Sequence, residues 1–127
     1  MSTRSCPNRV VLGVLMSPAH RLLDRTLLGL RVCGVMTGRA FELPVMYAQD
    51  DTGLVIFVGR SASKRWWRNL RYLTAIEVLT GGSWRSARAE VLQPGTPERE
   101  VARLAYERRW PRVTVGATDP LVRICEA

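Results

Sequence analysis

The sequence has few of the side chains that usually carry catalysis. It contains one histidine, His20, and one lysine, Lys64, among 127 residues. Because His20 falls in a segment with the period of an amphipathic helix, a Ser-His triad and a histidine metal site are both disfavoured. The Walker, GxGxxG and CxxC motifs are missing as well. No catalytic residue and no metal ligand can be named, so an enzyme of this composition needs a bound cofactor for its chemistry.

Cysteine is also scarce, and no apolar run is long. Cys6, Cys33 and Cys125 are odd in number and share no close spacing. This usage predicts reduced thiols in a cytoplasmic protein and argues against a disulfide framework or a zinc site. No run approaches the ~20 apolar residues that span a bilayer, which leaves at most peripheral membrane contact. The apolar run 10–16 is interpreted as a mature lead-in or strand rather than a secretory signal.

Acidic residues are outnumbered by basic ones. Eleven Asp and Glu stand against nineteen Lys and Arg, which gives a formal charge of +8. Eighteen of the nineteen are arginine, the residue best suited to bidentate contacts with phosphate and carboxylate groups. The excess favours anionic partners, namely phosphorylated cofactors, nucleic acid or acidic lipid. The length indicates a single domain with a real core, here 1–127.

The first half of the chain changes from a helical period to a strand period. Ser17 and Pro18 begin a predicted helix that ends near Gly29, and the segment 1–29 is taken as lead-in and helix. From Leu30 onward the period is two, and strands are predicted at 30–37, 42–48 and 54–59. Pro44 cannot donate to a ladder, which places it at a sheet edge, at a bulge or beside a ligand. The strand 54–59 is almost wholly apolar and should be buried on both faces.

The second half predicts a hairpin, a helix and a last strand. Gly81-Gly82 joins strands 76–80 and 83–92, the second of which has one wet face. Thr96 caps a helix that begins at Pro97 and stops at Pro111. The segment 121–126 is a short strand. Hairpins with inserted helices predict an α+β, mainly β domain, with an antiparallel sheet closed into a small barrel over about 30–127.

Two of the four tryptophans stand together in the segment Lys64–Arg71. On a helix, Trp66 and Leu70 share an apolar face, whereas Trp67 turns toward solvent. Asn69 lies beside the apolar face, where its amide needs hydrogen-bond partners. The segment is therefore either a core-filling helix with a solvated arginine rim or one wall of a ligand site.

Several pieces of the chain resemble the deazaflavin-dependent nitroreductase family of actinobacterial proteins. These pieces are 34–39, 43–47, the hairpin to Val58-Gly59, and 66–71, with Trp67-Arg68-Asn69-Leu70 the most specific. The likeness extends from about Leu28 to Leu92. It implies a six-stranded antiparallel split β-barrel of the FMN-binding type that uses coenzyme F-420. In such proteins the reduced deazaflavin passes a hydride to quinones, nitroaromatics or other electron-poor substrates.

The resemblance also implies a set of cofactor-binding residues. Thr37, Gly38 and Arg39 would face the phosphate or carboxylates of the coenzyme tail. Leu43, Pro44 and Val45 would line the ring pocket. Gly59, Arg60 and Ser61 would offer amides and charge to the ring edge or phosphate. The remaining members, which would close the site or add charge, are Lys64, Trp66, Trp67 and Asn69.

Alternatives follow from one departure from the family pattern. The family carries basic residues in its phosphate loop where this chain has Val35 and Met36. FMN, an apolar, lipid or haem-like ligand, or no cofactor are therefore alternatives to F-420, and a non-catalytic binding protein is the alternative to a reductase. A basic single-strand nucleic-acid binder that uses Trp and Arg is a third class. The expected burial of the aromatic residues disfavours that class, so no specific nucleic-acid partner is expected. Related barrels often pair, which is compatible with a homodimer.

Overall fold

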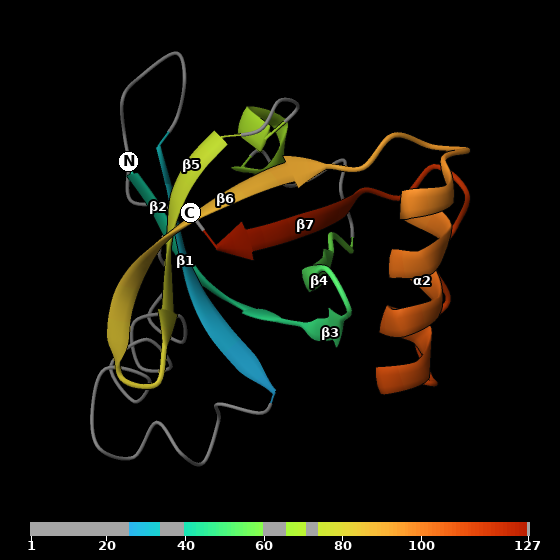
Figure 1. The fold of residues 1–127 in the computed structure, drawn as a ribbon, viewed down its shortest axis with the longest axis horizontal. Coiled ribbons are helices and arrows are strands. Elements are labelled where there is room, and N and C mark those ends of the chain that lie inside the picture. Colours follow the sequence, from blue (N-terminus) through green and yellow to red (C-terminus); the bar gives the residue numbers. More distant parts are fainter. Residues whose placement is uncertain (1–25, 34–39, 60–65, 71–73, 127) are drawn as a thin grey trace.

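The computed structural model describes residues 26–33, 40–59, 66–70 and 74–126 (Figure 1). Seven strands form one antiparallel sheet in the order β2-β1-β5-β6-β7-β4-β3. A five-residue 3-10 helix and one α-helix complete the described part of the chain. The elements, in chain order, are β1 (Leu27–Cys33), β2 (Ala40–Met46), β3 (Ala48–Asp50), β4 (Gly53–Phe57), η3 (Trp66–Leu70), β5 (Thr74–Thr80), β6 (Ser83–Val91), α2 (Pro97–Arg109) and β7 (Leu121–Glu126).

The first and last strands in this order, β2 and β3, belong to one nearly continuous segment of the chain. β2 pairs with β1 and β3 pairs with β4, yet only Tyr47 separates β2 from β3. This segment therefore brings the first and last strands of the sheet together. It also explains why the sheet has seven strands rather than the predicted six, because the predicted strand 42–48 is divided at Tyr47.

Pro44 lies on β2, opposite Gly29 of β1. Since β2 is the terminal strand of the described sheet, Pro44 faces no further ladder on its other side. The prediction of an edge position is confirmed.

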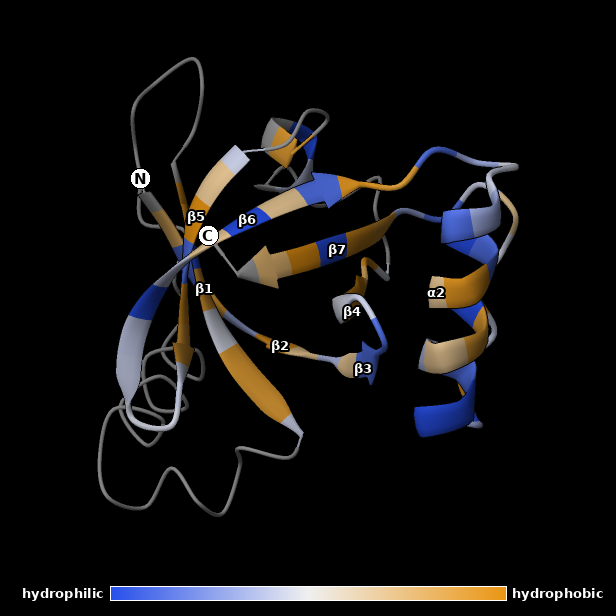
Figure 2. Ribbon diagram, in the orientation of Figure 1, coloured by the Kyte–Doolittle hydropathy of each residue, from blue (hydrophilic) through white to orange (hydrophobic). Residues whose placement is uncertain are grey.

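The core has two parts that share the sheet. One cluster lies on the inner face and includes Leu30, Ile56 and Val122. The second lies between the sheet and α2 and includes Val55 and Tyr106. Val55 and Ile56 are neighbours on β4 and are 0% and 1% exposed, which confirms that this strand is buried on both faces. In Figure 2 the hydrophobic colour covers most of β7 apart from one polar band, whereas β6 and α2 alternate between hydrophobic and polar bands.

α2 begins and ends as its sequence predicts. The Thr96 hydroxyl accepts a hydrogen bond from the Arg99 amide over 3.3 Å, and Pro97 is the first helical residue. Glu98 and Glu100 occupy the first turn, where the helix dipole favours negative charge. The helix ends at Arg109, two residues before Pro111.

Two predicted elements differ in the structure. The helix expected to reach Gly29 is wrong over its last three residues, since β1 begins at Leu27 and pairs with β2 from that residue. Leucines at 27, 28 and 30 fit both the helical period and the strand period. The pairing of β1 with β2 decides in favour of the strand. The tryptophan segment forms a 3-10 helix of five residues instead of a longer α-helix.

Candidate functional site

Trp67 lies half-buried at one end of the barrel. It packs against the inner core cluster, and Leu70 on the same short helix is 0% exposed. The expectation that Trp67 turns toward solvent is therefore wrong, because the tighter 3-10 turn places both Trp67 and Leu70 on the core side. The guanidinium carbon of Arg68 lies 5.7 Å from the centre of the Trp67 ring.

A cavity of about 330 Å³ opens beside this tryptophan. Two loops line it, one between β6 and α2 and the other before β7. The lining residues are Trp67, Val91, Leu92, Gln93, Pro94, Thr118, Asp119 and Pro120. The indole and two prolines give it apolar walls, and the Asp119 carboxyl is the one ionisable group among the lining residues that the structure describes.

Gly59 belongs to the same end of the barrel. The amide of Val58, the preceding residue, donates a hydrogen bond to the Pro120 carbonyl over 3.0 Å. Pro120 lines the cavity beside Trp67, so Val58, the residue before Gly59, is bonded to the loop that Trp67 faces.

Arg99 fixes that loop from inside the protein. It is only 4% exposed, and one of its terminal nitrogens donates to the carbonyls of Gly116 and Asp119, each over 2.7 Å. The Asp119 carboxylate in turn accepts from the Gly116 amide over 2.8 Å. A buried guanidinium requires such acceptors, and here they hold the residues that face Trp67. Sequence reasoning missed this contribution, although the turn-forming Asp119-Pro120 pair marked the loop.

The three residues expected to line a ring pocket do not share one face. Leu43 and Val45 pack against the inner core cluster. Pro44 lies between them on β2, and successive side chains of a strand point to opposite faces. A ligand that touches Pro44 from outside the barrel would therefore not meet Leu43 or Val45 on the same face.

The remaining predicted site residues lie outside the described part of the chain. These are Thr37, Gly38, Arg39, Arg60, Ser61 and Lys64, together with the side chains of Trp66 and Asn69. Val35 and Met36 lie outside it as well.

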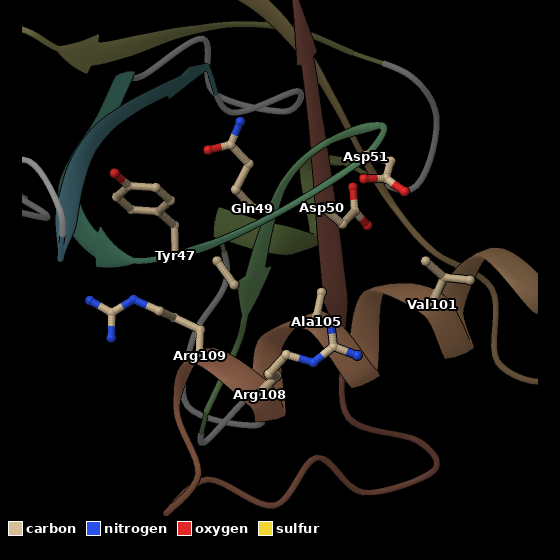
Figure 3. A pocket seen from close by; sticks show the side chains of 9 residues that line it. Tyr47, Gln49, Asp50, Asp51, Val101, Ala105, Arg108 and Arg109 are labelled. Carbon is tan, nitrogen blue, oxygen red and sulfur yellow. The ribbon is translucent and has the colours of Figure 1, made fainter.

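A second hollow of about 790 Å³ runs between β3 and α2. Figure 3 shows Arg108 and Arg109 on the helix side, and Asp50 and Asp51 at the end of the strand. Arg109 stacks its guanidinium over Trp110, with the carbon 4.0 Å from the ring centre. The two arginines extend from the last turn of α2, where cations also stabilise the helix dipole.

Asp50 is already engaged by another strand. Its two carboxylate oxygens accept from the two terminal nitrogens of Arg123 over 2.9 and 2.7 Å. The side chains of Arg123 and Asp50 are 10% and 6% exposed. Burial alone would raise the pKa of Asp50, but hydrogen bonds from the Thr52 amide, Arg123 and the Thr52 hydroxyl outweigh it, so that its pKa lies below the ordinary value. Asp50 is thus a structural anion and is not poised as a base.

Within the described ranges no group of three His, Cys, Asp or Glu residues is close enough to hold a metal ion. None of the helices described there is long and apolar enough to cross a membrane. The cavity beside Trp67 has an aromatic and apolar wall. The hollow between β3 and α2 has a pair of cations at the end of the helix.

No family model and no curated protein matches the sequence. Solved structures do match. HutZ, the haem storage protein from Vibrio cholerae, aligns with a TM-score of 0.65 at 13% identity over 88% of this chain and 90% of its own. The fold is a split β-barrel.

Two further split-barrel matches have similar scores. An F-420-H2-dependent reductase aligns with a TM-score of 0.58 at 18% identity, over 80% of this chain and 96% of its own. A structure described as a domain-swapped dimer aligns with a TM-score of 0.58 at 17% identity, over 91% and 92%. At these identities the likeness establishes the split barrel and the expected fold class.

Proposed function

We propose that this protein is a split-barrel reductase that binds a flavin-type cofactor, with coenzyme F-420 preferred, and that it belongs to the deazaflavin-dependent family which its sequence resembles. The observation that carries the proposal is the placement of Trp67. Its motif, Trp67-Arg68-Asn69-Leu70, is the most family-like piece of the sequence, and its indole forms a wall of a cavity at the barrel end. The likeness in fold to an F-420-H2-dependent reductase supports the choice of cofactor.

The described residues suit part of such a cofactor. Trp67, Pro94 and Pro120 provide flat, apolar surfaces, which favour a fused ring system. Gly59 directly follows Val58, whose amide is bonded to the Pro120 carbonyl of the same loop. The phosphate and carboxylates of F-420 would fall to Thr37, Gly38, Arg39, Arg60, Ser61 and Lys64, whose chemistry suits an anionic tail. When bound in its reduced form, the deazaflavin supplies a hydride to the electron-poor substrate.

The test is a titration of the purified protein with coenzyme F-420, followed by ultrafiltration and by quenching of tryptophan fluorescence. We expect a Kd in the micromolar range, on the order of −8 kcal/mol at 1 μM. Affinity should fall as salt rises, because the tail is anionic. A protein that binds no F-420 at tens of micromolar in low salt would contradict the proposal.

A matched pair of variants locates the site. Trp67→Phe should weaken F-420 binding, because Trp67 lines the cavity. Trp84→Phe should leave it unchanged, because Trp84 stacks under Arg31 on another part of the sheet, 4.1 Å from the guanidinium carbon. If the two substitutions change the affinity for F-420 equally, Trp67 does not form part of the F-420 site.

A non-catalytic binding protein is the second candidate. It is supported by the likeness to HutZ, a haem storage protein, and by Val35 and Met36 in place of the basic pair of the family. Absorbance spectra recorded during titration with haem and with FMN distinguish the two candidates. Haem binding without any turnover of reduced F-420 would favour the second.

A homodimer is part of the same proposal, since one structural match is described as a domain-swapped dimer. Light scattering coupled to gel filtration measures the mass directly. A mass near 28 kDa would support the dimer, being twice the 14.3 kDa of one chain, whereas 14.3 kDa would contradict it.

A further inference from the structure

A cavity of about 650 Å³ opens at the other end of the barrel. The Trp67 cavity lies where β6 ends and β7 begins, whereas this one is lined by residues near the start of β6 and the end of β7. Its floor consists of Leu54, Val78, Ala87 and Ile124, all of which belong to or pack on the inner core cluster. The barrel interior is therefore accessible here, and Ala87 leaves more room than a larger side chain would.

Polar groups stand directly beside this floor. Arg85 is the cross-strand partner of Val78, and Gln49 is the partner of Leu54. Partners in an antiparallel ladder project from the same face, so Arg85 and Gln49 extend over the mouth of the barrel. Figure 3 shows the Gln49 side chain pointing away from α2, in agreement with this. Thr80 lies two residues beyond Val78 and faces the same way.

Among the described residues that line the cavity, Arg85 is the single charged one. It is exposed, and among the described residues it has no hydrogen-bond or ion-pair partner. By contrast, Arg31 on β1 pairs with Glu42 and Glu77, and Arg123 on β7 pairs with Asp50. One free guanidinium over an apolar floor selects for one negative charge on an apolar body.

We propose that this end of the barrel binds a small monocarboxylate with an apolar body. The body packs on Leu54, Val78, Ala87 and Ile124, and the carboxylate pairs with Arg85. Thr80 and Gln49 also line the cavity, and their side chains are hydrogen-bond donors that suit a carboxylate. The site is separate from the proposed cofactor site, since the two cavities share none of the described lining residues.

Calorimetric titration with octanoate, octan-1-ol and octylammonium tests the choice of headgroup. These probes share one apolar body and differ only at the end that would meet Arg85. We expect octanoate to bind about tenfold more tightly than the alcohol, as a charge-assisted hydrogen bond implies, and octylammonium to bind least. No octanoate binding at millimolar concentration, or equal binding of acid and alcohol, would overturn the proposal.

Arg85→Gln and Arg88→Gln form a matched pair on β6. Both arginines are exposed, but Arg88 faces the opposite side of the strand. Arg85→Gln should abolish the preference for octanoate over octan-1-ol, and Arg88→Gln should retain it. Equal losses in the two variants would show a general charge effect and overturn the assignment of Arg85.

Cys125 gives a second readout that requires no variant. Cys125 is among the residues that line the cavity, and its half-buried thiol donates to the Thr52 carbonyl over 3.6 Å. Octanoate should slow alkylation of Cys125 by iodoacetamide, as quantified on the Cys125 peptide by mass spectrometry, and octylammonium should not. Unchanged alkylation at an octanoate concentration that saturates the calorimetric signal would place the ligand elsewhere. Neither measurement contains F-420, so a failed coenzyme titration leaves this proposal standing.

Discussion

The indole nitrogen of Trp110 donates a hydrogen bond to the main-chain carbonyl of Tyr47 over 3.0 Å. Tyr47 is the residue that separates β2 from β3, and Trp110 caps the end of α2. The interruption of the strand thus has a specific partner, because the Tyr47 carbonyl at the bend accepts from the Trp110 indole. The same contact ties the helix to the segment that joins the two ends of the sheet.

Trp110→Phe should lower the free energy of unfolding by about 1 kcal/mol, the usual net value of one hydrogen bond. Phenylalanine keeps an aromatic ring beneath Arg109 and removes only the N–H donor. Urea unfolding followed by circular dichroism measures the change. An unaltered midpoint would show that water replaces the indole at no cost.

Asp50→Asn should be much more costly, because it leaves Arg123 buried without its counter-charge. Removing one partner of a buried ion pair destabilises by about 3 kcal/mol or more. Asp51→Asn is the control, since Asp51 is the next residue and is exposed. Surface changes of that kind stay within about 0.5 kcal/mol, so similar effects of the two substitutions would contradict the structural role of Asp50.

Stability should fall in acid for the same reason. The pKa of Asp50 is lower in the folded protein than in the unfolded chain, so its contribution is present above the unfolded value and is lost as the pH falls through the folded value. Unfolding measured from about pH 7 down to about pH 2.5 should show a decline below about pH 4. Asp50→Asn should flatten that decline. The hydrogen bond from Arg103 also lowers the pKa of Glu100, but this carboxylate is exposed, so Glu100→Gln should change the decline less.

Gly53→Ala should disrupt the β3–β4 turn. Gly53 has φ of +153°, and a Cβ atom there would clash with the Ile124 carbonyl oxygen of the neighbouring strand. We expect a loss of more than about 2 kcal/mol. Gly95→Ala, at φ of +81° in open space, carries only the left-handed strain of about 1 kcal/mol. Equal losses at the two positions would mean that the clash relaxes freely.

The local signals of the sequence predicted much of this fold. The Thr96 cap with Pro97 placed the start of α2, and Gly81-Gly82, both at positive φ, placed the β5–β6 turn. Alternation along β6 predicted one wet face, and in the structure Ala87 and Ala89 lie on the buried one. Each signal depends on residues within one turn or one strand, and for that reason it could be recognised without the fold.

The candidate site was predictable only in part. The Trp67 motif identified one wall, but the loop that faces it, with Asp119 and Pro120, comes from 50 residues further along the chain and carries no periodic signal. Leu43, Pro44 and Val45 were grouped by resemblance, whereas the pleat of β2 separates them.

By itself the sequence determined the caps, turns and burial periods, and with them the mainly β class, because these follow from short-range backbone and solvation preferences. The tertiary structure alone decided the pairing of Asp50 with Arg123, the hold of Arg99 on the loop beside Trp67, and the bond from Trp110 to Tyr47. The partners in the first and last of these pairs are 73 and 63 residues apart. Arginine, aspartate and tryptophan tolerate many local environments, so only the closed barrel, which buries both partners together, selects which of them meet.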